Sequence, residues 1–269
     1  MISLPITVVI PCYKSASTIS RAIDSILKQT ALPKEVIIVD DYSNDGGLTI
    51  DTLKRIQQSS SLVIEVISLD CNVGPGSARN VGWESATQPY IAFLDADDSW
   101  HPEKLRTQYQ WMVSHPHVAL SGHASVMLNS QEEPQVFDGI VGMKKVSWLA
   151  LLLFNYFPTR TVLLKREIPF RFLSGKRYAE DYLLWLMIVL NHYPAYFLNL
   201  PMAYTYKEDF GESGLNGHLL KSHLGVIDTF KRLLNLKLIG LLTYILVSIF
   251  AYIKFSRRLI IAFIRYLKK

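Results

Sequence analysis

The sequence has little cysteine and no recognisable export signal. It contains two cysteines, Cys12 and Cys71, among 269 residues, which excludes a disulfide framework and fits a reducing compartment. The first thirteen residues, MISLPITVVIPCY, hold no basic segment and no small-residue cleavage site. We therefore expect them to form a first strand and not a signal peptide.

Acidic residues are absent from the end of the chain. Residues 1–150 contain 11 Lys and Arg against 16 Asp and Glu, a net charge of −5, whereas residues 151–269 contain 17 against 7, a net charge of +10. The last segment, 237–269, holds seven basic residues and no acid. Because these basic residues are interspersed with Leu, Ile and Phe, they favour a membrane surface over nucleic acid as the partner.

The apolar run in this tail is short for a membrane span. Residues 238–253 are sixteen uncharged residues, and a helix of that length reaches about 24 Å, less than the roughly 30 Å of a hydrocarbon core. Residues 254–269 mix basic and apolar side chains, as an in-plane amphipathic helix does. We expect a domain at 1–235 and a membrane-associating helical tail at 236–269. The alternative is a pair of core helices that cover the domain.

Strand and helix patterns alternate along the first hundred residues. Short β-branched runs predict buried strands, and apolar residues at helical spacing predict the helices between them. This alternation is typical of an α/β fold with a mostly parallel, doubly wound central sheet and flanking helices. The expected strands are 6–11, 35–41, 62–69 and 90–95, and the expected helices are 17–29, 46–58 and 76–86.

Several side chains suited to ligand binding follow directly after these strands. Pro11 and Tyr13 end the first strand, Asp40 and Asp41 end the second, and Asp95 ends the fourth. Parallel sheets bind ligands at the carboxyl ends of their strands, so we expect these residues to converge on one edge.

The segment YIAFLDADDSW places three carboxylates, Asp95, Asp97 and Asp98, after a hydrophobic strand. Like charges this close repel unless a cation lies between them or water surrounds the turn. An EF-hand loop is excluded because its sixth and twelfth positions, which require Gly and Glu, would be Trp100 and Arg106. A carboxylate pair that holds Mg²⁺ or Mn²⁺ together with phosphate oxygens remains, beside the alternative of a solvated acidic turn.

A glycine-containing loop, NVGPGSARNVG at 72–82, begins like a dinucleotide-binding fingerprint. Gly74 and Gly76 match, but Arg79 occupies the third glycine position. A loop that leads into a helix and favours anionic oxygens near Arg79 is the better interpretation, and a plain turn with a surface arginine is the alternative.

Two acids, Glu180 and Asp181, begin an expected helix at YAEDYLLW. Acidic residues are common in the first turn of a helix because the helix dipole stabilises them. The functional alternative is a general base that removes a proton from an acceptor hydroxyl.

Five segments stand in the order and spacing of family 2 inverting glycosyltransferases with the GT-A fold, and the chain resembles that family. They are TVVIPCYKSASTISRAIDSILKQT, EVIIVDDYSND, NVGPGSARNVGWESA, YIAFLDADD and EDYLLW. The resemblance covers residues 4 to about 210. The loop YKEDFGESGLN also resembles the acceptor-side loop of bacterial members that assemble polysaccharides. The Q-x-x-R-W motif of processive members is missing, which favours transfer of a single sugar.

The resemblance implies a role for each candidate residue on the nucleotide side. Pro11 and Tyr13 would line the nucleotide pocket. Asp41, with Asp40 beside it, would bind the base, which we expect to be uracil. Arg79 would lie near the nucleotide.

It also implies how the metal and the acceptor are handled. Asp97 would bind Mn²⁺ or Mg²⁺ directly, and Asp95 would contact the metal and the ribose of the nucleotide-sugar donor. Asp181 would be the catalytic base.

The implied reaction moves one sugar, with inversion, from a nucleotide-diphosphate sugar to a hydroxyl of a glycan or lipid-linked acceptor. The donor is expected to be a UDP-sugar, the setting cell-surface polysaccharide synthesis (O-antigen, capsule or exopolysaccharide), and the place the cytoplasmic face of the inner membrane, as a peripheral or monotopic protein. Two alternatives stay open. One is a membrane-tethered, inactive GT-A binding module. The other is a sugar nucleotidyltransferase, which is disfavoured because PCYKSAST lacks glycine.

Overall fold

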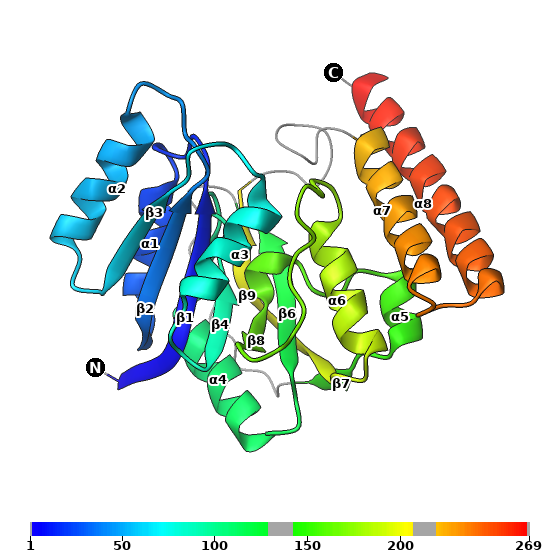
Figure 1. Cartoon of the computed structure of the whole chain (residues 1–269), viewed down its shortest axis with the longest axis horizontal. Coiled ribbons are helices and arrows are strands. Elements are labelled where there is room, and N and C mark those ends of the chain that lie inside the picture. The colour runs from blue at the N-terminus through cyan, green and yellow to red at the C-terminus, as the bar shows by residue number, and fades with distance from the viewer. Residues whose placement is uncertain (1, 129–141, 207–218, 268–269) are drawn as a thin grey trace.

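A computed structural model describes residues 2–128, 142–206 and 219–267, with side chains described up to residue 261. Most of the polar loop expected on the acceptor side, residues 207–216, lies outside the described residues. Figure 1 shows one central sheet with helices packed on both of its faces and two long helices at the C-terminal side.

The N-terminal half forms the parallel part of the sheet, as the alternation predicts. Strands β1 (Ile2–Cys12), β2 (Ala31–Asp40), β3 (Ile64–Ser68) and β4 (Tyr90–Phe93) pair in the order β3-β2-β1-β4, all parallel. The helices between them are α1 (Ile19–Leu27), α2 (Leu48–Ser59) and α3 (Pro75–Ser85). Cys12 lies opposite Asp40 and Val9 opposite Phe93, so the three strands finish at the same edge.

Alternate residues of these strands bury on opposite faces, as the period of two in a strand requires. Val9 packs with α3 and with helices of the C-terminal half, whereas Val8 and Ile10 pack with α1, α2 and α4 (Lys104–Ser114). Both faces of β1 are therefore covered, which explains its nearly continuous run of apolar residues.

The C-terminal half extends the sheet with mixed strand directions. Strand β8 (Leu163–Lys165) is antiparallel to β4 and to β6 (Leu120–Met127), and β9 (Ala195–Thr205) is parallel to β6. Two short strands, β5 (Ser99–Trp100) and β7 (Met143–Lys145), pair antiparallel with β9. The helical elements here are α5 (Trp148–Leu153), a 3₁₀ turn η1 (Thr159–Thr161) and α6 (Glu180–Leu190).

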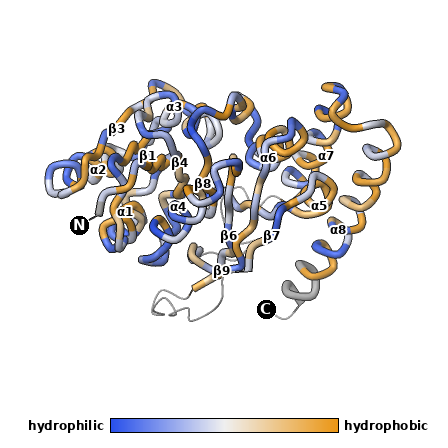
Figure 2. Tube along the Cα trace, turned by 90° about the horizontal axis from the view of Figure 1, so that it is seen from below, coloured by the Kyte–Doolittle hydropathy of each residue, from blue (hydrophilic) through white to orange (hydrophobic). Residues whose placement is uncertain are grey.

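The tail forms a helical hairpin of α7 (Leu219–Asn235) and α8 (Leu241–Leu267). The predicted break after residue 253 is absent, because α8 continues through it for 27 residues. Val247 and Ala251 join the core beside α5 and α7, while hydrophobic residues on the outer side of α8 remain exposed. Figure 2 shows hydrophobic positions along much of α8. Within the described residues, no helix has the length and apolar character needed to cross a membrane.

Candidate active site

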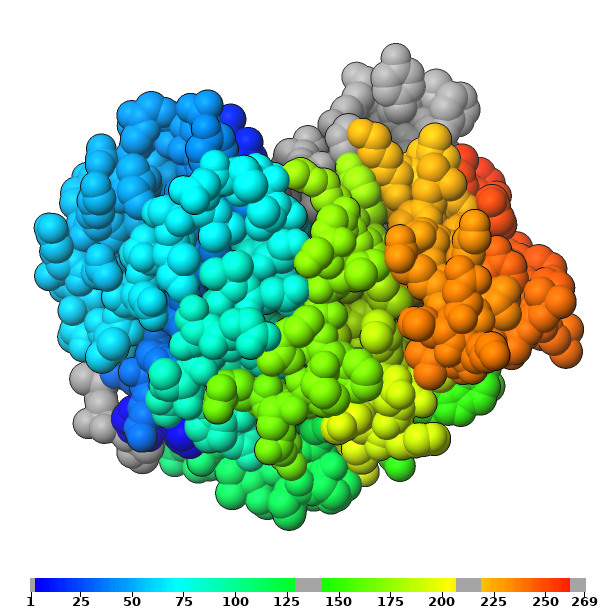
Figure 3. All heavy atoms as spheres, in the orientation of Figure 1, coloured from blue at the N-terminus to red at the C-terminus, as the bar shows by residue number. Residues whose placement is uncertain are grey.

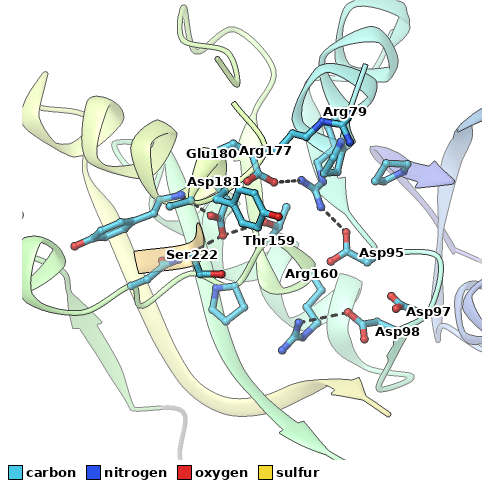
Figure 4. Close-up of a pocket in the computed structure, with 18 of the residues that line it drawn as sticks. Arg79, Asp95, Asp97, Asp98, Thr159, Arg160, Arg177, Glu180, Asp181 and Ser222 are labelled. Atoms are coloured by element: carbon cyan, nitrogen blue, oxygen red, sulfur yellow. Dashed lines mark hydrogen bonds and ion pairs between the residues drawn. The ribbon is translucent and has the colours of Figure 1, made fainter. Parts of the chain in front are cut away.

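A cleft of about 1060 Å³ opens at the ends of β1, β2 and β4 and continues to the start of α6 and to the tail helices (Figure 4). Seven of the eight predicted site residues line it: Pro11, Tyr13, Asp41, Arg79, Asp95, Asp97 and Asp181. The eighth, Asp40, is buried, with 5% of its surface exposed, and does not line the cleft. Asp41 is therefore the better placed of the two to meet a ligand, and contact between Asp40 and a base stays a prediction.

Asp41 joins the end of β2 to the loop before α3. Its Oδ1 accepts a hydrogen bond from the Val73 amide at 2.7 Å, and its Oδ2 accepts one from the Gly74 amide at 2.9 Å. Gly74 has a φ of +88°, a conformation that favours glycine, so this turn depends on the residue type. Burial raises the pKa of Asp41, although the two amides favour its charged form.

Arg79 is a buried guanidinium that connects two carboxylates from distant elements. Its Nη2 lies 2.6 Å from Oδ1 of Asp95, after β4, and its Nη1 lies 3.3 Å from Oε1 of Glu180, the first residue of α6. Figure 4 shows both pairs. Burial and the neighbouring Asp181 raise the pKa of Glu180 to about 7, against the attraction of Arg79. The Glu180 contact could not be predicted from the sequence, because it forms only when α6 packs beside α3.

Arginines also resolve the charge repulsion after β4. Asp95 pairs with Arg79, and the buried Asp98 pairs with Arg160, with 3.5 Å between Oδ2 and Nη1. Burial nevertheless raises the pKa of Asp98 to about 7. The sequence interpretation assumed that a cation or water must separate the three acids, whereas protein cations already pair with two of them.

Asp97 sits in a loop that α1 holds in place. Arg21 of α1 donates from Nη2 to the backbone carbonyl of Asp97 at 2.6 Å, and its guanidinium lies 3.7 Å from the centre of the Tyr206 ring. The Asp97 side chain lines the cleft. The backbone at Asp97 is therefore held by Arg21, which no sequence motif singled out.

The donor set fits a divalent cation that shares its coordination with a ligand. Among the described residues, no group of three or more His, Cys, Asp and Glu side chains could hold a metal ion alone. Mg²⁺ and Mn²⁺ do not need such a group, because they bind one or two carboxylates and complete their shell with phosphate oxygens and water. Asp97 and Asp95 offer two such carboxylates in one cleft.

Asp181 lies in the first turn of α6, after Ala179, whose φ of 55° is unusual for a non-glycine residue. Its Oδ1 accepts from the Tyr182 amide at 2.7 Å. Its Oδ2 accepts from the Thr159 hydroxyl at 3.3 Å and from Nδ2 of Asn155 at 3.4 Å. Burial raises the pKa of Asp181, which suits a group that must accept a proton.

The tail contributes side chains to the same cleft, which the division at residue 236 did not anticipate. These side chains lie on one side of the α7–α8 hairpin. They are Ser222, His223, Val226, Ala251, Lys254, Phe255 and Arg258. On α8 the spacing of 251, 254, 255 and 258 follows one helical face, a pattern that a search of the tail for a second polar face could have found.

A family model described as "Glycosyl transferase family 2" matches residues 7–174, more than half of the chain. The chain belongs to glycosyl transferase family 2. The transferase therefore has the enzyme class that its motifs indicate, and its predicted α/β fold is confirmed as GT-A by its likeness to solved structures.

Three comparisons place the transferase among its relatives. An Escherichia coli protein named UDP-Glc:alpha-D-GlcNAc-diphosphoundecaprenol beta-1,3-glucosyltransferase WfgD is 29% identical over 184 residues, which is 68% of this chain and 69% of that one. Residues 1–349 of S. aureus TarS, solved with UDP-GlcNAc, match with a TM-score of 0.68 and 23% identity over 86% of this chain and 67% of that one. The mannosyltransferase PcManGT from Pyrobaculum calidifontis, solved with GDP-Man and Mn²⁺, matches with a TM-score of 0.64 and 19% identity, over 86% and 64%.

Proposed function

We propose that the transferase moves one sugar from a UDP-sugar to a hydroxyl of a glycan or lipid-linked acceptor during cell-surface polysaccharide synthesis, with inversion at the anomeric carbon. The E. coli relative is named for transfer from UDP-Glc to a diphosphoundecaprenol-linked sugar, and TarS was solved with a UDP-sugar. Absence of the Q-x-x-R-W motif supports transfer of a single sugar over polymerisation.

One observation carries this proposal. Asp95 and Asp97, suited to a cation and a diphosphate, line the same cleft as Asp181, which is suited to accept a proton. Arg79 connects the two groups through its ion pairs with Asp95 and Glu180. A donor held at the strand ends and an acceptor held at α6 would therefore meet in one space.

The chain's own residues supply most of the mechanism. Asp181 removes the proton from the acceptor hydroxyl as its oxygen attacks the anomeric carbon on the face opposite the departing diphosphate, so an α-linked donor gives a β-linked product. Thr159 and Asn155 orient the Asp181 carboxylate through Oδ2. General-base assistance of this kind contributes about 10²–10⁴-fold in rate. A divalent cation bound by Asp97 and Asp95 would supply Lewis-acid stabilisation of the leaving diphosphate.

The tail supports a location at the cytoplasmic face of the inner membrane, with residues 236–269 as the part that touches lipid. Exposed hydrophobic side chains follow the outer side of α8, among them Leu242, Leu246, Ile249 and Ile253. Residues 237–269 add seven basic residues and no acid, which attracts anionic lipid headgroups. A lipid-linked acceptor would be anchored in the same membrane surface that the tail contacts.

A thermal-shift panel on the purified chain tests the donor assignment. UDP and UDP-sugars with Mn²⁺ should raise Tm, because a ligand at 100 times its Kd stabilises the folded state by about 2.7 kcal/mol, or several degrees for a domain of this size. GDP should act more weakly. Slow hydrolysis of the UDP-sugar should stop when a chelator removes the metal.

Two variants and two outcomes make this panel decisive. Asp97→Asn should lose the metal-dependent part of the shift, whereas Asp70→Asn, an exposed acid that does not line the cleft, should keep it. Binding of UDP without hydrolysis or transfer would favour the inactive binding module. If no nucleoside diphosphate raises Tm with either metal, the proposal is wrong.

A further inference from the structure

One face of α8 turns charged side chains toward the cleft. Ala251, Lys254, Phe255 and Arg258 follow the i, i+3, i+4, i+7 spacing of a single helical face, and all four line the cleft. Ser222 and His223 of α7 line it beside them. Lys254 and Arg258 define the basic end of the cleft. The α7–α8 hairpin, orange to red in Figures 1 and 3, lies on the other side of α6 from β1 and β4.

The Lys254 side chain is held in place. Its Nζ donates to the carbonyl oxygen of Leu153 at 2.5 Å and lies 5.2 Å from the ring centre of Phe154 and 4.9 Å from that of Phe250. A long side chain fixed in this way has already lost much of its rotamer entropy, so a ligand that binds it has less ordering to impose.

His223 gives this end of the cleft a rigid wall and a buried polar atom. Its ring stacks on Phe255, with centroids 4.4 Å apart and an interplanar angle of 8°, and meets Tyr252 edge-on. The residue is 5% exposed, and its Nε2 has no hydrogen-bond partner among the described residues. Because buried polar atoms in proteins are normally hydrogen-bonded, the Nε2 atom of His223 favours a ligand in the cleft that can form a hydrogen bond with it.

Charge selects an anion. Lys254 and Arg258 are four residues apart on one face of α8, where like charges repel each other, and both line the cleft. The pKa of Lys254 is lowered to about 8 by partial burial and by Arg258, which is the direction expected when two cations share a site. An anionic group between them would relieve the repulsion.

The opposite side of α8 indicates what kind of molecule carries that anion. Leu246, Ile249 and Ile253 are exposed there, so α8 separates an apolar outer surface from the charged cleft. A molecule with a lipid chain, a phosphate and a sugar would have surfaces for all three parts in order: the outer face of α8, the basic end, and Asp181.

We infer that Lys254 and Arg258 form a subsite for the phosphate or diphosphate that joins the acceptor sugar to its lipid. This inference rests on the proposed function and goes beyond it, because it assigns to the tail the recognition of the acceptor's anionic link, separate from the diphosphate of the donor. The acceptor would be selected by its phosphate as well as by its sugar.

Binding of two amphiphiles to the full chain, saturated with UDP and Mn²⁺ to fill the donor end, tests this subsite. Dodecyl diphosphate carries the anion without any sugar, and dodecyl glucoside carries none. By calorimetry below their micellar concentrations, the wild type should bind the diphosphate at least tenfold more tightly. Arg258→Gln and Lys254→Gln should each weaken diphosphate binding about tenfold or more, the usual effect of losing a charged hydrogen bond, and leave glucoside binding unchanged.

Arg257 provides the matched control. It neighbours Arg258 on the same helix, carries the same charge, is exposed and does not line the cleft. Arg257→Gln should bind both amphiphiles as the wild type does. Equal losses in Arg257→Gln and Arg258→Gln would overturn the inference in favour of general attraction by the tail, and equal wild-type affinity for the two amphiphiles would overturn it too.

Two further measurements separate the possible failures. Arg258→Lys, which keeps the charge, should recover part of the affinity, and an unchanged Tm shows that the variants fold. UDP binding, measured in each preparation, should be the same in all of them. If the wild type does not bind UDP, the proposed function itself is wrong. If UDP binds but the substitutions at Lys254 and Arg258 leave the affinity for dodecyl diphosphate unchanged, only the subsite is wrong.

Discussion

The two ends of the cleft differ in charge, in origin and in the way they are built. The strand-end side takes its acids from loops that follow β2 and β4, whereas the tail side takes Lys254 and Arg258 from one face of a long helix. The opposite net charges of the two halves of the sequence thus become opposite charges across one cleft. Acids suit a cation and the donor diphosphate it accompanies, and bases suit an anionic acceptor.

The centre of the cleft connects these two ends. Arg79 binds Asp95 on one side and Glu180 on the other, and Asp181 follows Glu180 directly. Asp181 therefore lies between the acidic end, which suits the donor, and the basic end, which suits the acceptor, where both substrates could reach it. This division of the cleft has testable consequences, and the largest expected effect concerns Asp181.

Replacing Asp181 by Asn should nearly abolish transfer. The amide keeps the size of the side chain but cannot take a proton, so kcat should fall by about 10²–10⁴-fold. The Kd for UDP, measured by calorimetry, should stay within a few-fold of the wild type because the strand-end side is unchanged. Asp51→Asn, an exposed acid of α2, should keep full activity. An Asp181→Asn variant that transfers sugar at the wild-type rate would refute the general-base role.

Replacing Arg79 by Met should destabilise the fold. It leaves Glu180 buried and Asp95 partly buried without their cation, and breaking a buried ion pair costs about 3 kcal/mol or more. Urea unfolding should show this loss, and adding Glu180→Gln in the same chain should restore part of it. Arg177→Met, an exposed arginine 2.6 Å from Asn72, should cost less than about 1 kcal/mol. No recovery in the double variant would show that Arg79 matters through packing alone.

The strand-end side could be predicted from the sequence because its signals are local. Each strand is a short apolar run, and each candidate residue follows its strand directly, so the rule for parallel sheets brings Pro11, Asp41 and Asp95 to one edge without knowledge of the tertiary fold. Asp40 shows the limit of that rule. Neighbouring residues after a strand point in different directions, and Asp41 was the one that reached the cleft.

The packing of the tail against the cleft and the internal partners of the acids could not be predicted, because both depend on contacts between distant segments. Nothing near Asp98 in the sequence points to Arg160, and nothing near Asp181 points to Asn155 and Thr159. In the sequence, the charge of Lys254 ends an apolar run, and for that reason residues 238–253 and 254–269 were expected to form separate segments. In the structure that charge is accommodated at the carbonyl of Leu153, so α8 continues.

A close contact between α3 and the sheet tests the scaffold beneath the strand ends. A Cβ at Gly82 would lie 2.5 Å from Cγ1 of Val9 and 3.3 Å from Cγ2 of Val39. Gly82→Ala should therefore lower the free energy of unfolding by about 1–3 kcal/mol through overpacking. Gly240→Ala, where a Cβ meets nothing within 4 Å, is the control and should leave stability nearly unchanged. A Gly82→Ala chain as stable as the control would mean that α3 packs more loosely than the structure shows.

The smallest effect concerns pH at the basic end. The pKa of Lys254 is lowered to about 8, first by burial and then by Arg258, so Lys254 loses its charge in the folded protein as pH rises through 8. His223 on α7 stays neutral there because burial lowers its pKa, and Arg258 stays charged. At α5, Lys254 meets an uncharged carbonyl and the Phe154 ring.

Dodecyl diphosphate should therefore bind several-fold more weakly at pH 9 than at pH 7.5, with Lys254 as the titrating group. Lys254→Arg should bind with nearly the same Kd at both pH values, because a guanidinium keeps its charge across this range. Comparison of the two proteins at each pH cancels any change in the charge of the amphiphile itself. If the wild-type Kd changes with pH no more than that of Lys254→Arg, Lys254 does not belong to the subsite. Arg258, whose charge is constant over this pH range, would then be its cation.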